Sequence, residues 1–140
     1  MARSSKAGTT TGHGEVRRLW PAERDLFKAH LLRLDEVTRR ERFGTAVNDD
    51  FLENYAVTTF GVGGLVYAYI EDGAVRGAAE LRGLEDIMAQ TGEAAFSVER
   101  DWRRRGIGGT LFGRLITAAR NRSIRTLYMT CLPENAAMRR

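Results

Sequence analysis

The sequence has few of the residues that build disulfides and metal sites, and it has no apolar run of membrane length. Its 140 residues include one cysteine and two histidines, too few for an internal disulfide or a dedicated metal site. The best apolar run, 65–70, has the length of a strand and falls far short of the roughly 20 residues of a membrane span. The N-terminus also lacks the apolar core of a secretory signal. These absences predict a soluble, cytoplasmic protein with no metal and no membrane partner.

The charge is unevenly placed along the chain. The net charge is only +4, but residues 97–140 contain ten arginines against three acidic residues, whereas residues 1–96 contain twelve basic and fifteen acidic residues. A local positive potential of this kind attracts an anion such as nucleic acid, an acidic membrane or a phosphorylated small molecule. Arginine is better suited than lysine to bidentate contact with phosphate. A solvated basic face is the other interpretation of the same charge.

The pattern of apolar residues predicts one α/β domain over 15–140, with helices packed on a mixed sheet, preceded by a flexible tail over 1–14 that is rich in Ser, Thr and Gly. His30 lies on the apolar stripe of the first helix and is predicted to be a partly buried core residue. The expected elements are a strand at 15–20, a helix at 21–35, a charged loop or ragged helix end at 38–43, a helix from the N-cap Asn48 to about Phe60, strands at 65–71 and 74–84 joined by Asp72-Gly73, a strand at 94–99, a helix at 107–120, a strand at 124–131 and a helix starting at Pro133.

Residues 98–109 form the segment that most strongly indicates a binding site. A strand ends, a short loop with three consecutive arginines follows, and glycines begin an amphipathic helix. The first N–H groups of a helix have no internal partner and carry partial positive charge, so this segment predicts an anion cradle. It is not a dinucleotide fingerprint, because Leu111 stands at the third small position and Thr126 where the ribose-binding acid belongs, and it lacks the Gly-Lys-Ser/Thr of a Walker loop.

These residues resemble motif A of the GNAT acyltransferase superfamily. The motif is Arg103-x-x-Gly106-x-Gly108, five residues after a strand valine, and the similarity extends through 77–82, 95–99 and 132–138. The resemblance implies a GNAT-like N-acyltransferase fold that binds acetyl-CoA or another acyl-CoA. Main-chain groups of Phe96 and Val98 would contact the pantetheine arm, and Asn135 would contact the cofactor. The pyrophosphate would lie on the loop formed by Arg103, Arg104, Arg105, Gly106, Ile107, Gly108 and Gly109.

The resemblance also implies direct attack of an acceptor amine on the thioester. An amine with a pKa near ~10.4 is mostly protonated at neutral pH, so a base must remove a proton. Glu99, at the end of the strand before the loop, is the first candidate and Glu80 the second; pairing of either with a nearby arginine is the structural alternative. The Val98 N–H is expected to donate to the thioester oxygen. Cys131 is interpreted as a buried structural thiol and Tyr128 as a packing residue.

The identity of the acceptor and the completeness of the fold stay open. Members of the family usually continue past the last motif helix with two more strands, so we expect these C-terminal strands to be missing, either because the chain is truncated or because a partner chain, such as a second copy, completes the sheet. The acceptor is a small-molecule or protein amine. One rival interpretation is a non-catalytic acyl-CoA-binding sensor. A nucleic-acid-binding module is less favoured, because aromatic residues are not interleaved with the arginines, Trp102 excepted.

Overall fold

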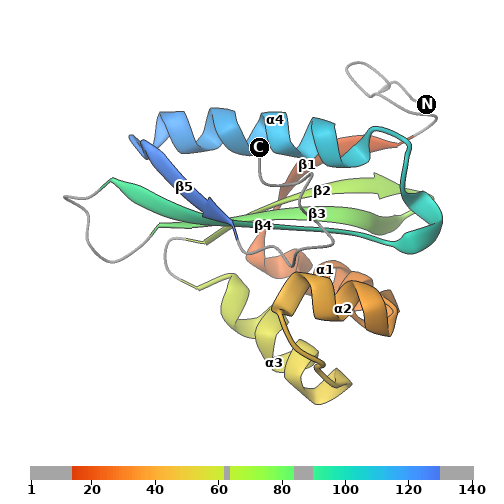
Figure 1. Cartoon of the computed structure of the whole chain (residues 1–140). Coiled ribbons are helices and arrows are strands. Elements are labelled where there is room, and N and C mark those ends of the chain that lie inside the picture. The colour runs from red at the N-terminus through yellow and green to blue at the C-terminus, as the bar shows by residue number, and fades with distance from the viewer. Residues whose placement is uncertain (1–13, 62–63, 84–89, 130–140) are drawn as a thin grey trace.

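The protein is a three-layer α/β/α sandwich, seen here in a computed structural model that describes residues 14–61, 64–83 and 90–129. A five-stranded sheet forms the middle layer; α4 covers one face, and α1, α2 and α3 lie on the other (Figure 1). The strands are β1 (Glu15–Leu19), β2 (Gly64–Glu71), β3 (Ala74–Gly83), β4 (Thr91–Val98) and β5 (Thr126–Met129). The α-helices are α1 (Arg24–Arg33), α2 (Glu36–Phe43), α3 (Asp49–Thr59) and α4 (Ile107–Asn121), with short 3-10 turns at Pro21–Glu23 and Arg100–Trp102. The predicted α/β class is confirmed.

The sheet follows chain order, and its last pair differs from the others. Strands β1 to β4 pair antiparallel, and the β2–β3 hairpin turns at Asp72 and Gly73, both with positive φ (58° and 74°). By contrast, β5 pairs parallel with β4, because α4 carries the chain back across the sheet between them. In the described part of the chain this parallel ladder runs from Thr91 only as far as Ala94, opposite Met129.

Two apolar clusters hold the layers together. On one face, Phe27 and Leu31 of α1 and Leu52 of α3 pack against β2 and β3. On the other, Leu111 and Leu115 of α4 pack against residues of β2, β3 and β4. The apolar residues recur at helical spacing in the helices and at alternating positions in most of the strands. Strands β1, β2 and β3 contribute to both clusters, whereas β4 and β5 contribute to the second. The sheet is therefore fixed from both sides, which gives the loop between β4 and α4 a rigid frame.

Three sequence predictions need correction. Residues 38–43, expected as a loop or ragged helix end, belong to α2, which buries only Thr38 and therefore shows no apolar stripe in the sequence. The strand predicted at 94–99 begins three residues earlier, at Thr91. Gly14, placed in the flexible tail, is buried; a Cβ there would lie 2.0 Å from the Tyr69 ring. Residues 1–13, the helix from Pro133 and the last two residues of the strand at 124–131 lie outside the described residues.

Helix α2 forms because its ends are capped. The Asp35 carboxylate accepts the Thr38 N–H at 2.7 Å, and Gly44 ends the helix with φ 80°, its N–H bonded to the Arg40 carbonyl. The bond from the Thr38 N–H, with a further ion pair to Arg100, lowers the pKa of Asp35 to about 2. Local capping thus makes a helix that hydrophobic periodicity does not reveal.

Loss of this cap should be measurable. We expect Asp35→Ala to lower the free energy of unfolding by about 1 kcal/mol at pH 7, because an N-cap acceptor is lost, and Asp35→Asn to cost less because an amide oxygen also caps. The folded-state pKa lies below the unfolded value of about 3.9, so this contribution is present above pH 4 and disappears as the pH falls towards 2. Urea unfolding of the two variants at pH 7 tests this; an alanine variant as stable as wild type would contradict it.

Candidate active site

The N-terminus of α4 is an uncapped helix end. Gly106 precedes it with φ 81° and no side-chain cap, and the Thr110 N–H makes a bond typical of the helix interior, to the Gly106 carbonyl at 3.1 Å. The N–H groups of Ile107, Gly108 and Gly109 therefore have no partner within the helix. A Cβ placed on Gly108 or Gly109 would meet nothing within 4 Å, so open space lies beside this end. Such an end favours an anion.

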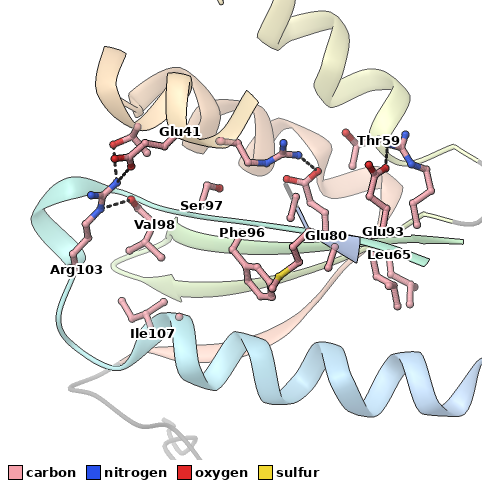
Figure 2. A pocket seen from close by; sticks show the side chains of 18 of the residues that line it. Glu41, Thr59, Leu65, Glu80, Glu93, Phe96, Ser97, Val98, Arg103 and Ile107 are labelled. Carbon is pink, nitrogen blue, oxygen red and sulfur yellow. Dashed lines mark hydrogen bonds and ion pairs between the residues drawn. The ribbon is translucent and has the colours of Figure 1, made fainter. Parts of the chain in front are cut away.

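The three consecutive arginines make different contacts. Arg103 turns back to the end of β4 and to α2 (Figure 2): Nε donates to the Val98 carbonyl at 3.3 Å, and Nη2 donates to Thr38 Oγ1 at 2.8 Å and lies 3.6 Å from Glu41 Oε1. Arg105 stacks on the Trp102 ring, with its guanidinium carbon 4.6 Å from the centroid. Arg104 is exposed, with φ 65°. Arg103 thus holds the loop in place, and the other two keep their charge at the surface.

The outer edge of β4 presents backbone groups beside this loop. The N–H of Glu99 donates to the Arg76 carbonyl of β3 at 3.0 Å. Since successive residues of a strand alternate their backbone groups between its two edges, the N–H and carbonyl of Val98 face away from β3, and the bond from Arg103 to that carbonyl agrees. Phe96 lies two residues earlier on β4, so its N–H and carbonyl face away from β3 as well. Ala94 is the last β4 residue that the described part of β5 pairs with, and beyond it Phe96 and Val98 line a cavity.

A cavity of about 400 Å³ begins at the N-terminus of α4 and continues under α2 and α3. Arg103, Arg104, Gly106, Ile107 and Gly108 line the end next to α4; among the described residues Arg105 and Gly109 do not line it. Figure 2 shows Phe96, Val98 and Ile107 on the α4 side of the sheet and Glu80 and Ser97 on the side of α2 and α3. The cavity therefore connects the helix end and the β4 edge with a second, more polar chamber.

Glu80 is the central charge of this polar chamber. It is 6% exposed, and its Oε1 accepts from Arg42 Nη2 at 2.9 Å and from the Tyr55 hydroxyl at 2.5 Å. Burial, and then the charge of Glu80, raises the pKa of Tyr55, so the phenol stays protonated and donates. The other oxygen, Oε2, is buried and has no hydrogen-bond partner within the described residues. Glu80 thus lines a cavity large enough for a small molecule and keeps one carboxylate oxygen without a hydrogen-bond partner in the described residues.

Glu99 is arranged differently and does not line the cavity. Its carboxylate contacts His30 Nδ1 at 3.0 Å, Arg33 Nε at 2.9 Å and Arg76 Nη1 at 3.3 Å. Burial opposes its charge, but the bonds from His30 and Arg33 outweigh burial, and the pKa of Glu99 lies below its usual value. Of the two carboxylates predicted as bases, the geometry therefore favours Glu80, the second candidate, because it alone faces the cavity.

Sequence reasoning missed the residues that surround these carboxylates. Arg42 and Tyr55 come from segments predicted as a loop and as an ordinary helix. His30, predicted as a partly buried core residue, is completely buried, and its Nε2 lies 2.8 Å from Ser97 Oγ. Strand alternation is the one signal that places Ser97 and Glu99 on the same face. Tyr128, predicted to pack, is 56% exposed. Asn135 and Cys131 lie outside the described residues.

Two negative findings concern the described residues alone. No group of three or more His, Cys, Asp or Glu side chains in 14–61, 64–83 and 90–129 is arranged to hold a metal ion. Within the same ranges, no helix has both the length and the hydropathy needed to cross a membrane.

The layered fold and the cavity beside a glycine-led helix agree with the acyltransferase fold that the resemblance to motif A implies. Residues 17–140 match the model of the Acetyltransferase (GNAT) family, which spans most of the chain. The chain therefore belongs to the GNAT acetyltransferase family, as its resemblance to motif A predicts. No curated protein matches the sequence.

Solved structures with the same fold are distant in sequence. The GNAT domain of S. lividans PAT matches with a TM-score of 0.75 at 19% identity, over 91% of this chain and 77% of that one. A ribosomal-protein-alanine N-acetyltransferase from Brucella melitensis biovar Abortus 2308 gives 0.64 at 20% identity, over 89% and 86%. An aminoglycoside acetyltransferase from an uncultured soil metagenomic sample gives 0.63 at 16% identity, over 89% and 82%. At such identities the likeness shows the fold alone.

Proposed function

We propose that this protein transfers an acetyl group from acetyl-CoA to an amine, by direct attack of the amine while both substrates are bound. The observation that carries the proposal is Glu80, which lines a cavity that runs on to the uncapped end of α4 and whose Oε2 has no hydrogen-bond partner in the described residues. The family supplies the class of reaction, and the cavity provides a place for an acceptor next to the cosubstrate.

The α4 end fits the diphosphate of the cosubstrate. The N–H groups of Ile107, Gly108 and Gly109 have no partner within the helix, and open space lies where a Cβ would stand at the two glycines, so phosphate oxygens can approach the backbone. Arg104 and Arg105 add positive charge from the surface, and the edge of β4 at Phe96 and Val98 offers backbone groups to the pantetheine arm. When bound, acetyl-CoA supplies the acetyl group as a thioester. The predicted contribution of Asn135 stays a prediction.

Glu80 is the base in this proposal. An ammonium group in the polar chamber would donate to the free Oε2 and then lose its proton to it, which leaves the neutral amine needed for attack. Arg42 and Tyr55 hold Oε1, so the second oxygen keeps a fixed direction. The outward-facing N–H of Val98 donates to the oxygen on which negative charge develops. Glu99 stays outside this step, because it does not face the cavity.

The charges of the cavity favour an acceptor with a single amine. Among the described residues, three carboxylates line the cavity, and each has an arginine partner: Glu80 with Arg42 at 2.9 Å, Glu93 with Arg82 at 2.9 Å, and Glu41 with Arg103 at 3.6 Å. A site for a polycation would need an excess of unpaired negative charge. We therefore propose a small molecule or chain terminus with one amine rather than a polyamine.

Binding of nucleic acid is the weaker alternative. Two of the arginines that give the C-terminal half its charge make contacts within the protein: Arg100 with Asp35, and Arg103 with Thr38 and Glu41. Cations engaged in this way are less available for a row of phosphates. An acyl-CoA sensor without turnover would share the α4 end but would have no use for the free oxygen of Glu80.

Two measurements separate these functions. We expect acetyl-CoA at about 100 times its Kd to stabilise the protein by about 2.7 kcal/mol, visible as a rise in Tm, and duplex DNA to have no such effect. A panel of mono-amines and polyamines, assayed by release of the CoA thiol, then tests turnover, with the mono-amines expected to react faster. Stabilisation by DNA but not by acetyl-CoA would contradict the proposal, and stabilisation without thiol release from any amine would favour the sensor.

A further inference from the structure

A serine, a histidine and a glutamate are joined in series under the cavity. The Ser97 hydroxyl lies 2.8 Å from His30 Nε2, and His30 Nδ1 lies 3.0 Å from Glu99 Oε2. Because a carboxylate only accepts, His30 Nδ1 donates to Glu99, and an Nε2 that carries no hydrogen accepts from the Ser97 hydroxyl. A nucleophile, a base and a group that orients the base thus stand in hydrogen-bond contact, which is the arrangement that activates a hydroxyl.

The supporting groups hold this arrangement in one geometry. His30 lies on α1 and is completely buried. The Glu99 carboxylate is held by Arg33, which also lies on α1, and by Arg76 of β3. Arg33 is itself anchored by a bond from Nη2 to the Val75 carbonyl at 2.7 Å. The base and its carboxylate therefore cannot turn away from Ser97 without breaking several buried contacts, which keeps the imidazole aligned with the hydroxyl.

Ser97 is the member of the series that faces the cavity. In the β3–β4 register it pairs with Ala78, and Glu80 is the next residue of β3 on the same face, so Ser97 and Glu80 are diagonal neighbours. Both line the cavity, and both lie on the same side of the sheet (Figure 2). Ser97 is only 4% exposed, so a reagent reaches its hydroxyl through the cavity and not from bulk solvent.

We propose that Ser97 is a nucleophile and that this protein hydrolyses activated esters of small acids, an activity distinct from amine acetylation. Ser97 Oγ bonds to the acyl carbon while its proton passes to His30 Nε2, and His30 gives that proton to the alcohol oxygen as the carbon–oxygen bond to the leaving alcohol breaks. Water then adds to the acyl carbon and gives a proton to His30 Nε2, and His30 passes this proton to Oγ as the Oγ–acyl bond breaks and the acid departs. Glu99 is a positioning residue that holds the imidazole.

The first experiment uses p-nitrophenyl acetate on the whole chain without CoA or amine. We expect a burst of p-nitrophenolate, one acetyl group on the peptide that contains Ser97, and a rate about 100-fold above that of Ser97→Ala, the size of contribution expected from a positioned base. Ser123, an exposed residue with φ 61°, is the matched control, and Ser123→Ala should behave as wild type. Equal rates in wild type and Ser97→Ala, or acetyl groups only on other residues, would overturn the proposal.

A second variant tests whether His30 acts as a base even if ester turnover is slow. In Ser97→Cys with Cys131→Ser, the new thiol is the only one in the chain. If His30 acts as a base, iodoacetamide should alkylate this thiol with a pH midpoint well below the ordinary thiol pKa of about 8.5, and adding Glu99→Gln should move the midpoint upward. A purely structural network would leave the midpoint at or above 8.5. Neither assay contains acetyl-CoA, so a negative result for Ser97 would not contradict the acetyl-transfer proposal. A negative result in the acetyl-CoA assays would likewise not contradict the proposal that Ser97 hydrolyses esters.

Discussion

Glu80→Gln is expected to lower the rate of acetyl transfer at pH 7 by about 10²–10³-fold, with little change in acetyl-CoA binding. Glutamine has the same shape and still offers an oxygen to Arg42 and Tyr55, but it cannot take a proton from an ammonium group. Since the amine is mostly protonated at neutral pH, the variant must wait for the rare neutral form. The steady-state rate with the best mono-amine from the thiol-release panel, measured beside the Kd for acetyl-CoA, tests this.

The pH dependence separates a base from a packing residue. As the pH approaches the pKa of the free amine, about 10, the neutral form becomes abundant, so the defect of Glu80→Gln should shrink. Glu93→Gln is the matched control, because Glu93 also lines the cavity and pairs with an arginine but has no buried oxygen without a partner in the described residues. A defect that stays constant across the pH range, or an equal defect in Glu93→Gln, would remove Glu80 from the proton-transfer step.

The parts of the fold that local chemistry determines could be predicted from the sequence. Asp72-Gly73 between two β-rich runs specifies the β2–β3 hairpin, and the spacing of Leu111 and Leu115 specifies α4. Helix α2 could not be found in this way, because its sequence has almost no apolar face and its formation depends on Asp35 and Gly44 at its ends. A periodic pattern of apolar residues arises where one face of a helix is buried. Helix α2 buries only Thr38, so its sequence shows no such pattern.

The candidate site likewise has a part that local sequence determines and a part that depends on contacts between residues distant in the chain. The glycine-led end of α4 is a local feature, so its residues were predictable as a group. The environment of Glu80 is made of contacts 25 and 38 residues away in sequence, to Tyr55 and Arg42, and that of Glu99 of a contact 69 residues away, to His30. Nothing in a single sequence indicates which distant arginine or histidine will meet which carboxylate. For this reason the order of the two candidate bases could be judged only once the sheet and helices were assembled.

Gly108→Trp is expected to weaken acetyl-CoA binding by at least about 100-fold, equivalent to about 2.7 kcal/mol, and to abolish the rise in Tm that the cosubstrate causes. A side chain at this position would enter the open space beside the first N–H groups of α4, where the diphosphate is proposed to lie. The backbone there is helical, and tryptophan suits a helix better than glycine does, so the variant should fold. Isothermal titration with acetyl-CoA gives the affinity directly.

Gly113→Trp is the matched control for Gly108→Trp. Gly113 lies on the same helix, is exposed, and also has open space where a Cβ would stand, but it does not line the cavity. The two variants therefore add the same bulk to the same element, and they differ in whether that bulk meets the proposed diphosphate. Normal binding by Gly113→Trp with lost binding by Gly108→Trp would assign the effect to the helix end itself. If Gly108→Trp bound acetyl-CoA as wild type does, the cosubstrate would have to lie elsewhere, and the role proposed for Val98 would fail with it, because the β4 edge and the α4 end border the same cavity.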